Sequence, residues 1–208
     1  GSLVVEPWLD RVVDVSVQFE VGKSGEQPDP DRVLGITRFR TNARGQYKGT
    51  HIGPFMSGLE PELRRWIAGP QGKAFLLSRH LERTARFVAT KLRNLGYSGP
   101  AGVDAMVYRD ARGLRLKPIV EINPRYTMGH IALALEGRVP GRRSGEFQLV
   151  SGPEAKRLGF ATLPDYYQHL VDADAGGPLS ADCPERRIAL SEPRAGAIIM
   201  AVLHLPSP

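Results

Sequence analysis

Three polar side chains occupy alternate positions at the end of an apolar strand, in the stretch LKPIVEINPRYTMGH (116–130). They are the carboxylate of Glu121, the carboxamide of Asn123 and the guanidinium of Arg125. A surface loop could carry these groups at little cost, whereas a strand end that leads into a core must desolvate them. The spacing therefore indicates a binding or catalytic site.

A fourth polar side chain, that of Asp104, is expected on the same face as this cluster. The segments on either side of residues 110–113 are predicted strands joined by a four-residue turn. With a turn of this length Asp104 faces Ile119, and Glu121 lies diagonally opposite, because side chains alternate across a strand. Asn123 shares the parity of Glu121, so one face of the hairpin presents all three oxygen-bearing side chains. A turn with an odd number of residues would separate them.

Two carboxylates and a carboxamide are hard oxygen ligands, and they suit Mg²⁺, which completes its octahedron with waters and substrate phosphates. Without a metal, two close carboxylates repel and one tends to stay protonated. Arg125 is placed to reach a phosphoryl oxygen with its planar fork. The alternative is a salt bridge between Glu121 and Arg125 at a strand end, with Asn123 capping a turn, and spacing alone leaves it open.

The order of the predicted elements indicates an α+β fold, with strands first, then one long helix, then strands again. The alternation over 12–21 predicts a strand with one apolar and one solvated face. Apolar residues at steps of three and four predict the helix over 73–95, whose arginines are expected to be solvated. The other expected strands are 32–40, 45–52, 102–109, 114–121, 187–190 and 195–203, the other helices are 128–136 and 164–173, and 137–160 is expected to be a loop or extension.

The motifs GVDAMVY (102–108) and VEINPR (120–125) together resemble the metal-binding hairpin of the ATP-grasp enzymes. This superfamily includes biotin carboxylase, carbamoyl phosphate synthetase, D-alanine–D-alanine ligase and glutathione synthetase. The resemblance implies that Asp104, Glu121 and Asn123 hold Mg²⁺, with Mn²⁺ as the alternative ion, on the phosphates of ATP. The Asn-Pro-Arg run followed by a histidine resembles the biotin-carboxylase-like branch, which implies a catalytic role for Arg125. His130 is the matching histidine, although a packed, hydrogen-bonded histidine is the simpler reading.

A second stretch, VVEPWLDRVVDVSV (4–17), resembles the hinge strand of the same superfamily. The resemblance implies that this segment binds the adenine edge and that an acidic residue beyond it contacts the ribose or the phosphates. A flat apolar slot with backbone donors and acceptors suits adenine. Core packing of Trp8 and a solvated position for Asp14 remain the alternatives. The residues implied are Glu6, Pro7, Trp8 and Leu9 for adenine and Asp14 for the ribose or phosphate side.

Three further cationic residues follow the hinge. In the superfamily, the hairpin and loop at this place often help to bind the co-substrate or phosphate. By position these are Arg38, Arg40 and His51. Arg38 and Arg40 share a strand face, and a solvated strand arginine is the alternative for each.

The resemblance covers 3–135 and the closing strands, which is the C-terminal lobe of an ATP-grasp protein. Residues 1–2 are interpreted as a cloning remnant, 3–135 as the lobe that binds metal and ATP, and 136–208 as an extension whose strands return to that lobe. The N-terminal domain and the lid, which carries phosphate-clamping lysines, do not precede Leu3 in this sequence. We therefore expect the chain to bind ATP weakly by itself, since phosphoryl transfer depends on positioning and charge neutralisation.

The composition limits the other function classes. No apolar run approaches the roughly 20 residues of a membrane helix, and the single cysteine, Cys183, excludes an internal disulfide and fits a cytoplasmic, reducing setting. The net charge of +6 and pI near 9.7 allow nucleic acid as a partner. However, aromatic residues are 7% and do not interleave with the basic ones as a stacking surface requires. Anionic small ligands are therefore favoured.

Three functions follow from these observations. The first is an ATP-dependent ligase that activates a small carboxylate, such as an amino acid or peptide, and joins it to an amine. The second is a non-catalytic domain of the same fold that binds a nucleotide or a protein partner. The third is a basic nucleic-acid-binding module, which would show steep salt dependence. The presence of all three oxygen ligands favours the first.

Overall fold

The computed structural model describes residues 3, 5–23, 25, 31–69, 76–139, 143–173, 185–194 and 196–206. Cys183, the first two residues and the predicted start of the long helix at 73–75 lie outside these ranges. The chain divides into two compact units, each made of two segments. The first is Gly1–Arg38 with Gly58–Gly129, and the second is Phe39–Ser57 with His130–Pro208. The functional boundary predicted after residue 135 stays a prediction.

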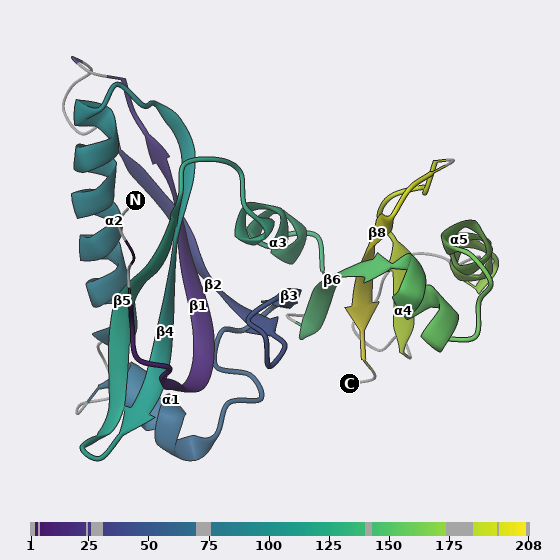
Figure 1. The fold of residues 1–208 in the computed structure, drawn as a ribbon, viewed down its shortest axis with the longest axis horizontal. Helices are drawn as coiled ribbons and strands as arrows, with labels where there is room; N and C mark the ends of the chain where they lie inside the picture. The colour runs from purple at the N-terminus through teal and green to yellow at the C-terminus, as the bar shows by residue number, and fades with distance from the viewer. Residues whose placement is uncertain are drawn as a thin grey trace. The chain divides into compact units, whose positions relative to one another are not determined.

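The first unit is a sheet covered by a helix. Its strands follow the order β5-β4-β1-β2, and β2 continues into the second unit. Helix α2 packs along β1, β4 and β5, and Figure 1 shows it lying lengthwise on these strands. The bounds are β1 Asp10–Val21, β2 Arg32–Thr41, β4 Gly99–Asp110, β5 Gly113–Asn123, α1 Pro61–Ala68 and α2 Leu76–Asn94.

Strand β1 is buried on both faces, so the expectation of a solvated polar face is wrong. Val15, Val17 and Phe19 are at most 1% exposed, as their apolar parity predicts. Ser16 and Gln18 on the other face are 4% and 0% exposed. The reason is that a segment remote in sequence covers this face, since a Cβ on Gly129 would lie 2.1 Å from Gln18 Nε2. The polar side chains are hydrogen-bonded to neighbours described below.

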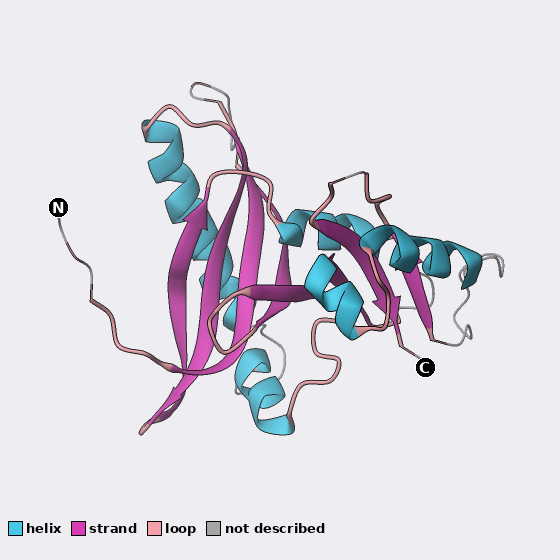
Figure 2. Ribbon diagram, turned by 45° about the vertical axis from the view of Figure 1, so that its right-hand side comes forward, coloured by secondary structure: helices cyan, strands magenta, loops and turns pink. Residues whose placement is uncertain are grey.

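The second unit has the strand order β2-β3-β6-β8-β7, and Figure 2 distinguishes its helices from these strands by colour. β3 pairs antiparallel with β6, and β6 pairs antiparallel with β8. An apolar cluster that includes Val150, Leu163, Leu170 and Met200 forms its core. The bounds are β3 Tyr47–Ile52, β6 Gly145–Ser151, β7 Arg186–Ala189, β8 Ile199–Leu205, α3 Met128–Glu136 (which starts at the unit boundary), α4 Gly152–Arg157 and α5 Leu163–Ala173.

The predicted loop over 137–160 is wrong, because β6 and α4 lie within it. Helix α4 begins with a capping box: the Ser151 hydroxyl accepts from the backbone N–H of Glu154, and the Glu154 carboxylate accepts from the Ser151 N–H at 2.9 Å. The Ser-Gly-Pro-Glu sequence carries this signal, which glycine and arginine content obscured. The last strand also begins later than predicted, at Ile199.

The α+β class is confirmed, since every strand pair whose register is described is antiparallel. The helical part is divided among five described helices, of 6 to 19 residues. None of the helices in the described ranges combines the length and apolarity that crossing a membrane requires.

Replacing Glu154 by glutamine should lower the free energy of unfolding by about 1 kcal/mol at pH 7. Burial opposes ionisation of Glu154, but hydrogen bonds from Lys48 and Ser151 outweigh it and lower its pKa from 4.5 to about 2. A lowered carboxyl pKa contributes stability above the unfolded value of 4.5, and that stability is lost as pH falls towards 2. The difference in urea midpoint between wild type and variant should therefore shrink from pH 7 to pH 3. Glu192→Gln, at an exposed position, is the control, and a difference that does not change with pH would contradict this account.

Candidate functional site

The hairpin β4–β5 sets Asp104 directly opposite Glu121. Near its turn the register is the predicted one, but it shifts between Asp104 and Met106, so the prediction that Asp104 faces Ile119 is wrong by two residues. The shift occurs where β5 contains Pro118, which has no N–H to donate to the ladder and is tolerated at edge strands and bulges. Because the slip is even, the facing side chains keep the predicted parity.

Two rows of residues cross this face of the first unit. Ser16 on β1 is opposite Asp104, which is opposite Glu121. In the next row Gln18 is opposite Gly102, which is opposite Asn123. Gly102 has no side chain, and Thr127 fills the space over it, since an added Cβ would lie 2.9 Å from Thr127 Cγ2. Exposure rises along the first row, from buried Ser16 on β1 to exposed Glu121 on the edge strand β5, whereas the second row is buried from Gln18 to Asn123.

Hydrogen bonds connect the residues that the sequence singled out. Asn123 donates from Nδ2 to Oδ2 of Asp104 at 3.2 Å, and Arg125 donates from Nη2 to Oδ1 of Asn123 at 2.8 Å. Asn123 is 4% exposed, whereas Arg125 is exposed and also donates to the Tyr126 carbonyl at 3.4 Å. In this arrangement Asn123 links the guanidinium to the carboxylate of Asp104, whereas the alternative of a strand-end cluster organised by a Glu121–Arg125 salt bridge would not require this link.

Burial raises the pKa of Asp104 above its usual value of 3.8. A hydrogen bond from Ser16 and the charge of Arg125 lower it, while the negative charges of Glu121 and Asp14 raise it further. The face therefore concentrates negative charge around a half-buried carboxylate, and a cation placed there would relieve the repulsion.

The donor set fits Mg²⁺ in part. Among the described residues, no group of three His, Cys, Asp or Glu side chains is arranged to hold a metal. Mg²⁺ nevertheless needs only one or two carboxylates when phosphates and waters fill the remaining positions. Asp104 and Glu121 are opposite each other and could supply those carboxylates. Asn123 could add its carbonyl oxygen only if Oδ1 turned away from Arg125, because that oxygen now accepts the guanidinium's hydrogen bond.

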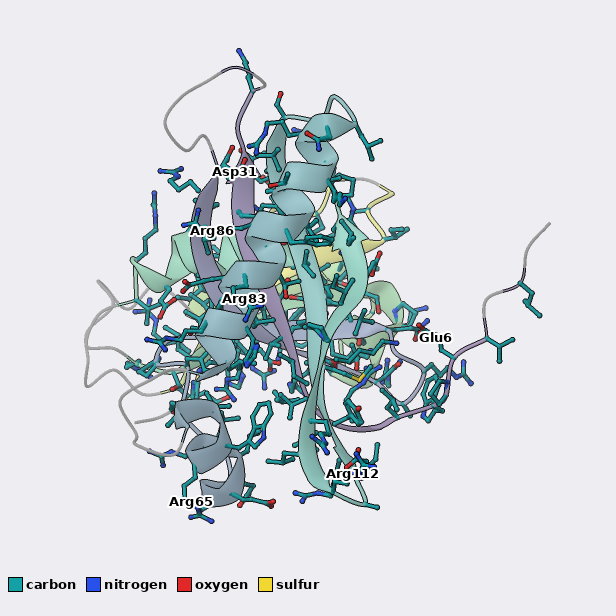
Figure 3. All side chains as sticks on the ribbon, turned by 90° about the vertical axis from the view of Figure 1, so that its left-hand side faces the viewer. Glu6, Asp31, Arg65, Arg83, Arg86 and Arg112 are labelled. Carbon is teal, nitrogen blue, oxygen red and sulfur yellow. The ribbon has the colours of Figure 1, made fainter. Side chains whose placement is uncertain are left out.

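The hinge residues lie on the exposed N-terminal segment before β1. Glu6, Pro7 and Trp8 are exposed, Trp8 by 83%, and Leu9 is half-buried. Glu6 Oε2 is 2.7 Å from Lys117 Nζ on β5. Figure 3 labels Glu6 on this segment and Arg112 at the tip of the β4–β5 turn. The structure excludes core packing of Trp8 and leaves its role in adenine binding a prediction.

Asp14 lies on β1 on the same face as Ser16 and is 7% exposed. Arg11 Nη1 is 3.2 Å from Oδ2 of Asp14. The negative charge of Asp14 in turn acts to raise the pKa of Asp104. Asp14 is therefore the one hinge-strand residue of the predicted set that belongs with the carboxylate cluster, and the alternative of a solvated position is excluded.

Arg38 lies apart from this cluster, beside a cavity of about 470 Å³ in the first unit. Burial lowers the pKa of Arg38 to about 10, so it stays a cation at neutral pH. The cavity is lined by apolar and charged groups, among them Val13, Leu63 and Glu60, and by Arg109, which forms two hydrogen bonds with Glu62 at 2.8 and 3.0 Å.

The remaining predicted residues belong to the second unit. Arg40 makes a bidentate pair with Glu146, with both contacts at 2.6 Å, which raises its pKa. His51 is half-buried, with Nε2 3.2 Å from the Pro54 carbonyl. His130 is 9% exposed, near the start of α3. The pairing of Arg40 with Glu146 is a structural ion pair. None of these contacts gives Arg40, His51 or His130 a ligand-binding role.

Sequence reasoning missed Ser16 and Gln18. Both lie on the polar parity of β1, which was interpreted as a solvated face, yet both are buried: Ser16 is opposite Asp104, and Gln18 is hydrogen-bonded to Ser16. Their residue types were a usable signal. Ser and Gln are neutral and can both donate and accept hydrogen bonds, whereas a solvated strand face usually carries charged side chains.

No protein-family profile matches the sequence, and no curated protein matches it. The solved structures that resemble this chain include biotin carboxylases. The biotin carboxylase domain of Hydrogenobacter thermophilus 2-oxoglutarate carboxylase, bound to MgADP, ADP and bicarbonate, is 15% identical with a TM-score of 0.43. The comparison covers 94% of this chain and 42% of that one. Biotin carboxylase from Campylobacter jejuni, in a β-γ-ATP complex, is 12% identical with a TM-score of 0.48, covering 97% and 43%.

The chain thus spans less than half the length of the biotin carboxylases it matches. At identities of 12–15% a likeness of this kind concerns the fold and assigns no activity.

Proposed function

We propose that this chain is the metal- and nucleotide-binding lobe of an ATP-grasp carboxylate–amine ligase. The observation that carries the proposal is the cluster on the β4–β5 face, where Asp104 and Glu121 are opposite each other and Asn123 connects Asp104 to Arg125. The residue types and order, Asp on one strand and Glu-x-Asn-Pro-Arg on the next, are those of the superfamily's metal-binding hairpin.

Each residue has a distinct part in this proposal. Asp104 and Glu121 would hold Mg²⁺, or Mn²⁺, which supplies charge neutralisation on the phosphates of ATP. Arg125 is exposed beside them and would orient a phosphoryl oxygen with its planar fork. Asn123 keeps Arg125 next to the carboxylates, since its carboxamide bonds to both. Such preorganised charge is usually the largest contribution to catalysis of this kind.

The proposed reaction has two steps. An oxygen of the carboxylate substrate attacks the γ-phosphorus of ATP and ADP leaves, giving an acyl phosphate. An amine then attacks the acyl carbon and phosphate leaves, so that the products are the amide, ADP and phosphate. Glu6–Leu9 as the adenine-binding segment, Arg38, Arg40, His51 and His130 as further contacts to phosphate or co-substrate, and a cytoplasmic location are parts of the same proposal.

The proposal also assigns part of the active site to other domains. Clamping of the phosphates would come from a lid and an N-terminal domain of the same protein, so the 208-residue chain by itself should bind nucleotide weakly and turn over little. Amino acid or peptide carboxylates are the proposed substrate class.

The test is binding of Mn²⁺–ADP to the chain at millimolar ADP, measured as the enhancement of water-proton relaxation over the same Mn²⁺–ADP solution without protein. We expect saturable binding by the wild type and a loss of affinity of at least about 10-fold in Glu121→Gln, because one of two carboxylates is neutralised. Glu82→Gln, at an exposed position of α2, is the matched control and should bind like the wild type.

Two results would contradict the proposal. One is a wild-type chain that gives no relaxation enhancement at any ADP concentration, which would favour a non-catalytic, partner-binding domain. The other is equal affinity in wild type and Glu121→Gln, which would place the ion elsewhere.

A further inference from the structure

A chain of buried hydrogen bonds reaches Asp104 from the interior of the sheet. Thr37 on β2 donates from Oγ1 to Oε1 of Gln18 at 3.5 Å, and Gln18 donates from Nε2 to Oγ of Ser16 at 2.7 Å. Ser16 in turn lies directly opposite Asp104 on the neighbouring strand, and a hydrogen bond from its side chain acts to lower the pKa of that carboxyl. Thr37, Gln18 and Ser16 are 5%, 0% and 4% exposed, so water does not compete for these contacts.

The direction of these bonds follows from the chemistry of the groups. A serine hydroxyl has one proton, and a carboxylate can only accept. Because the Ser16 oxygen already accepts from Gln18, its proton is directed to Asp104. Donors aligned in one direction strengthen one another.

Asp104 therefore receives hydrogen bonds from two sides. Ser16 donates from β1, and Asn123 donates from β5 at 3.2 Å. Two donors on neighbouring strands, each itself held by a further side chain, restrict rotation of the carboxylate about its side-chain bonds. The same restriction is what partners behind a metal ligand provide in metalloproteins.

Gly129, at the start of α3, leaves space for the Gln18 side chain in this series of hydrogen bonds. A Cβ atom at this position would lie 2.1 Å from Gln18 Nε2 and 2.4 Å from Cδ, far inside van der Waals contact. Glycine in a helix costs about 1 kcal/mol relative to alanine. Its presence beside a fully buried glutamine is explained by this close approach.

We propose that Ser16 and Gln18 are positioning residues, which hold the Asp104 carboxylate in its metal-ligating orientation. This inference rests on the proposed function, because it concerns the orientation of a ligand in that site. Neither residue needs to touch the metal or the nucleotide; both act through Asp104. Thr37 fixes the far end of Gln18.

The experiment measures Mn²⁺ affinity of the 208-residue chain with ADP present, together with thermal unfolding. Ser16→Ala should weaken Mn²⁺ binding by about 10-fold, as is typical when a partner behind a ligand is removed. Ser16→Thr retains the hydroxyl and suits a strand, so it should restore affinity to within about 3-fold of the wild type. Ser98→Ala, at an exposed loop position, is the matched control.

Gln18→Met tests the second link, because methionine fills a similar volume without donor or acceptor. It should weaken Mn²⁺ binding by several-fold with Ser16 intact, and the double variant with Ser16→Ala should be no weaker than Ser16→Ala alone, because the two residues act in series. This variant also keeps the proposal testable should Ser16→Ala fold poorly.

The outcomes separate the inference from the function it rests on. If the wild type binds Mn²⁺ and Ser16→Ala and Gln18→Met bind equally well, the positioning role is wrong and the metal site stands. If both variants unfold at lower temperature with unchanged affinity, the bonds are structural only, which also overturns the inference. If the wild type itself does not bind, the proposed function fails and the inference fails with it.

Discussion

Asp104→Asn is expected to weaken Mn²⁺ binding in the presence of ADP by at least about 100-fold, more than the roughly 10-fold effect of removing a partner behind it. The reason is that Asp104 lies at the centre of the cluster, with Ser16, Glu121 and Asn123 around it. The enhancement of water-proton relaxation in Mn²⁺–ADP solutions measures the effect.

The stability of the Asp104→Asn variant should change in the opposite direction to its Mn²⁺ affinity. Burial raises the pKa of Asp104, so the charged form costs stability at pH 7, and this cost is relieved as pH falls through the raised pKa towards 3.8. Asparagine has no charge to desolvate. The variant should therefore unfold at an equal or higher urea concentration than the wild type at pH 7, with the difference shrinking towards pH 4.

The control for this pair of results is Asp110→Asn. Asp110 ends the same strand, is exposed and accepts from the backbone N–H of Arg112 at 2.8 Å. It should leave Mn²⁺ affinity unchanged. Loss of both affinity and stability in Asp104→Asn would mean that the carboxylate serves the fold, and the site assignment would have to be abandoned.

Gly53→Ala should destabilise the second unit by more than about 3 kcal/mol, because two costs combine there. Gly53 has φ +101°, which alanine rarely adopts. An added Cβ would also lie 2.3 Å from the carbonyl oxygen of Arg143, a backbone atom that cannot rotate away. Hydrogen exchange at the amides of β6 reports the loss, since Ile52 pairs with Gly145 beside this contact.

Gly45→Ala separates the two costs. Gly45 lies in the β2–β3 turn with φ +76°, and an added Cβ there would meet no atom within 4 Å. It should cost only about 1–2 kcal/mol, from the backbone conformation alone. Equal losses in the two variants would show that the chain near Arg143 shifts to accommodate the methyl group.

The sequence predicted the parity of the site better than its register. Counting from the turn correctly put Asp104, Glu121 and Asn123 on one face, because alternation survives an even slip. It could not predict that Glu121, rather than Ile119, lies opposite Asp104, because the effect of Pro118 on the ladder depends on which edge of β5 is unpaired.

Burial of the polar face of β1 was beyond a local pattern. The alternating Val15 and Val17 predict the apolar face of the strand. Burial of Ser16 and Gln18 on the other face depends on contacts with residues that are remote in sequence, such as Gly129. The missed helix α4 is a different failure, since its capping box is local and was present in the sequence at Ser151 and Glu154.

Each unit is built from two separate segments of the sequence, and this arrangement has a consequence for synthesis of the chain. Thr50 on β3 is paired on one side with Phe39 and on the other with Phe147. The first partner precedes it closely, but the second follows almost a hundred residues later. At roughly 5–20 residues per second, the outer edge of β3 waits for about 5–20 seconds on a translating ribosome before β6 exists to cover it. During that interval it is an open template for strand addition, so slowed translation between residues 53 and 145 would favour aggregation of the nascent chain.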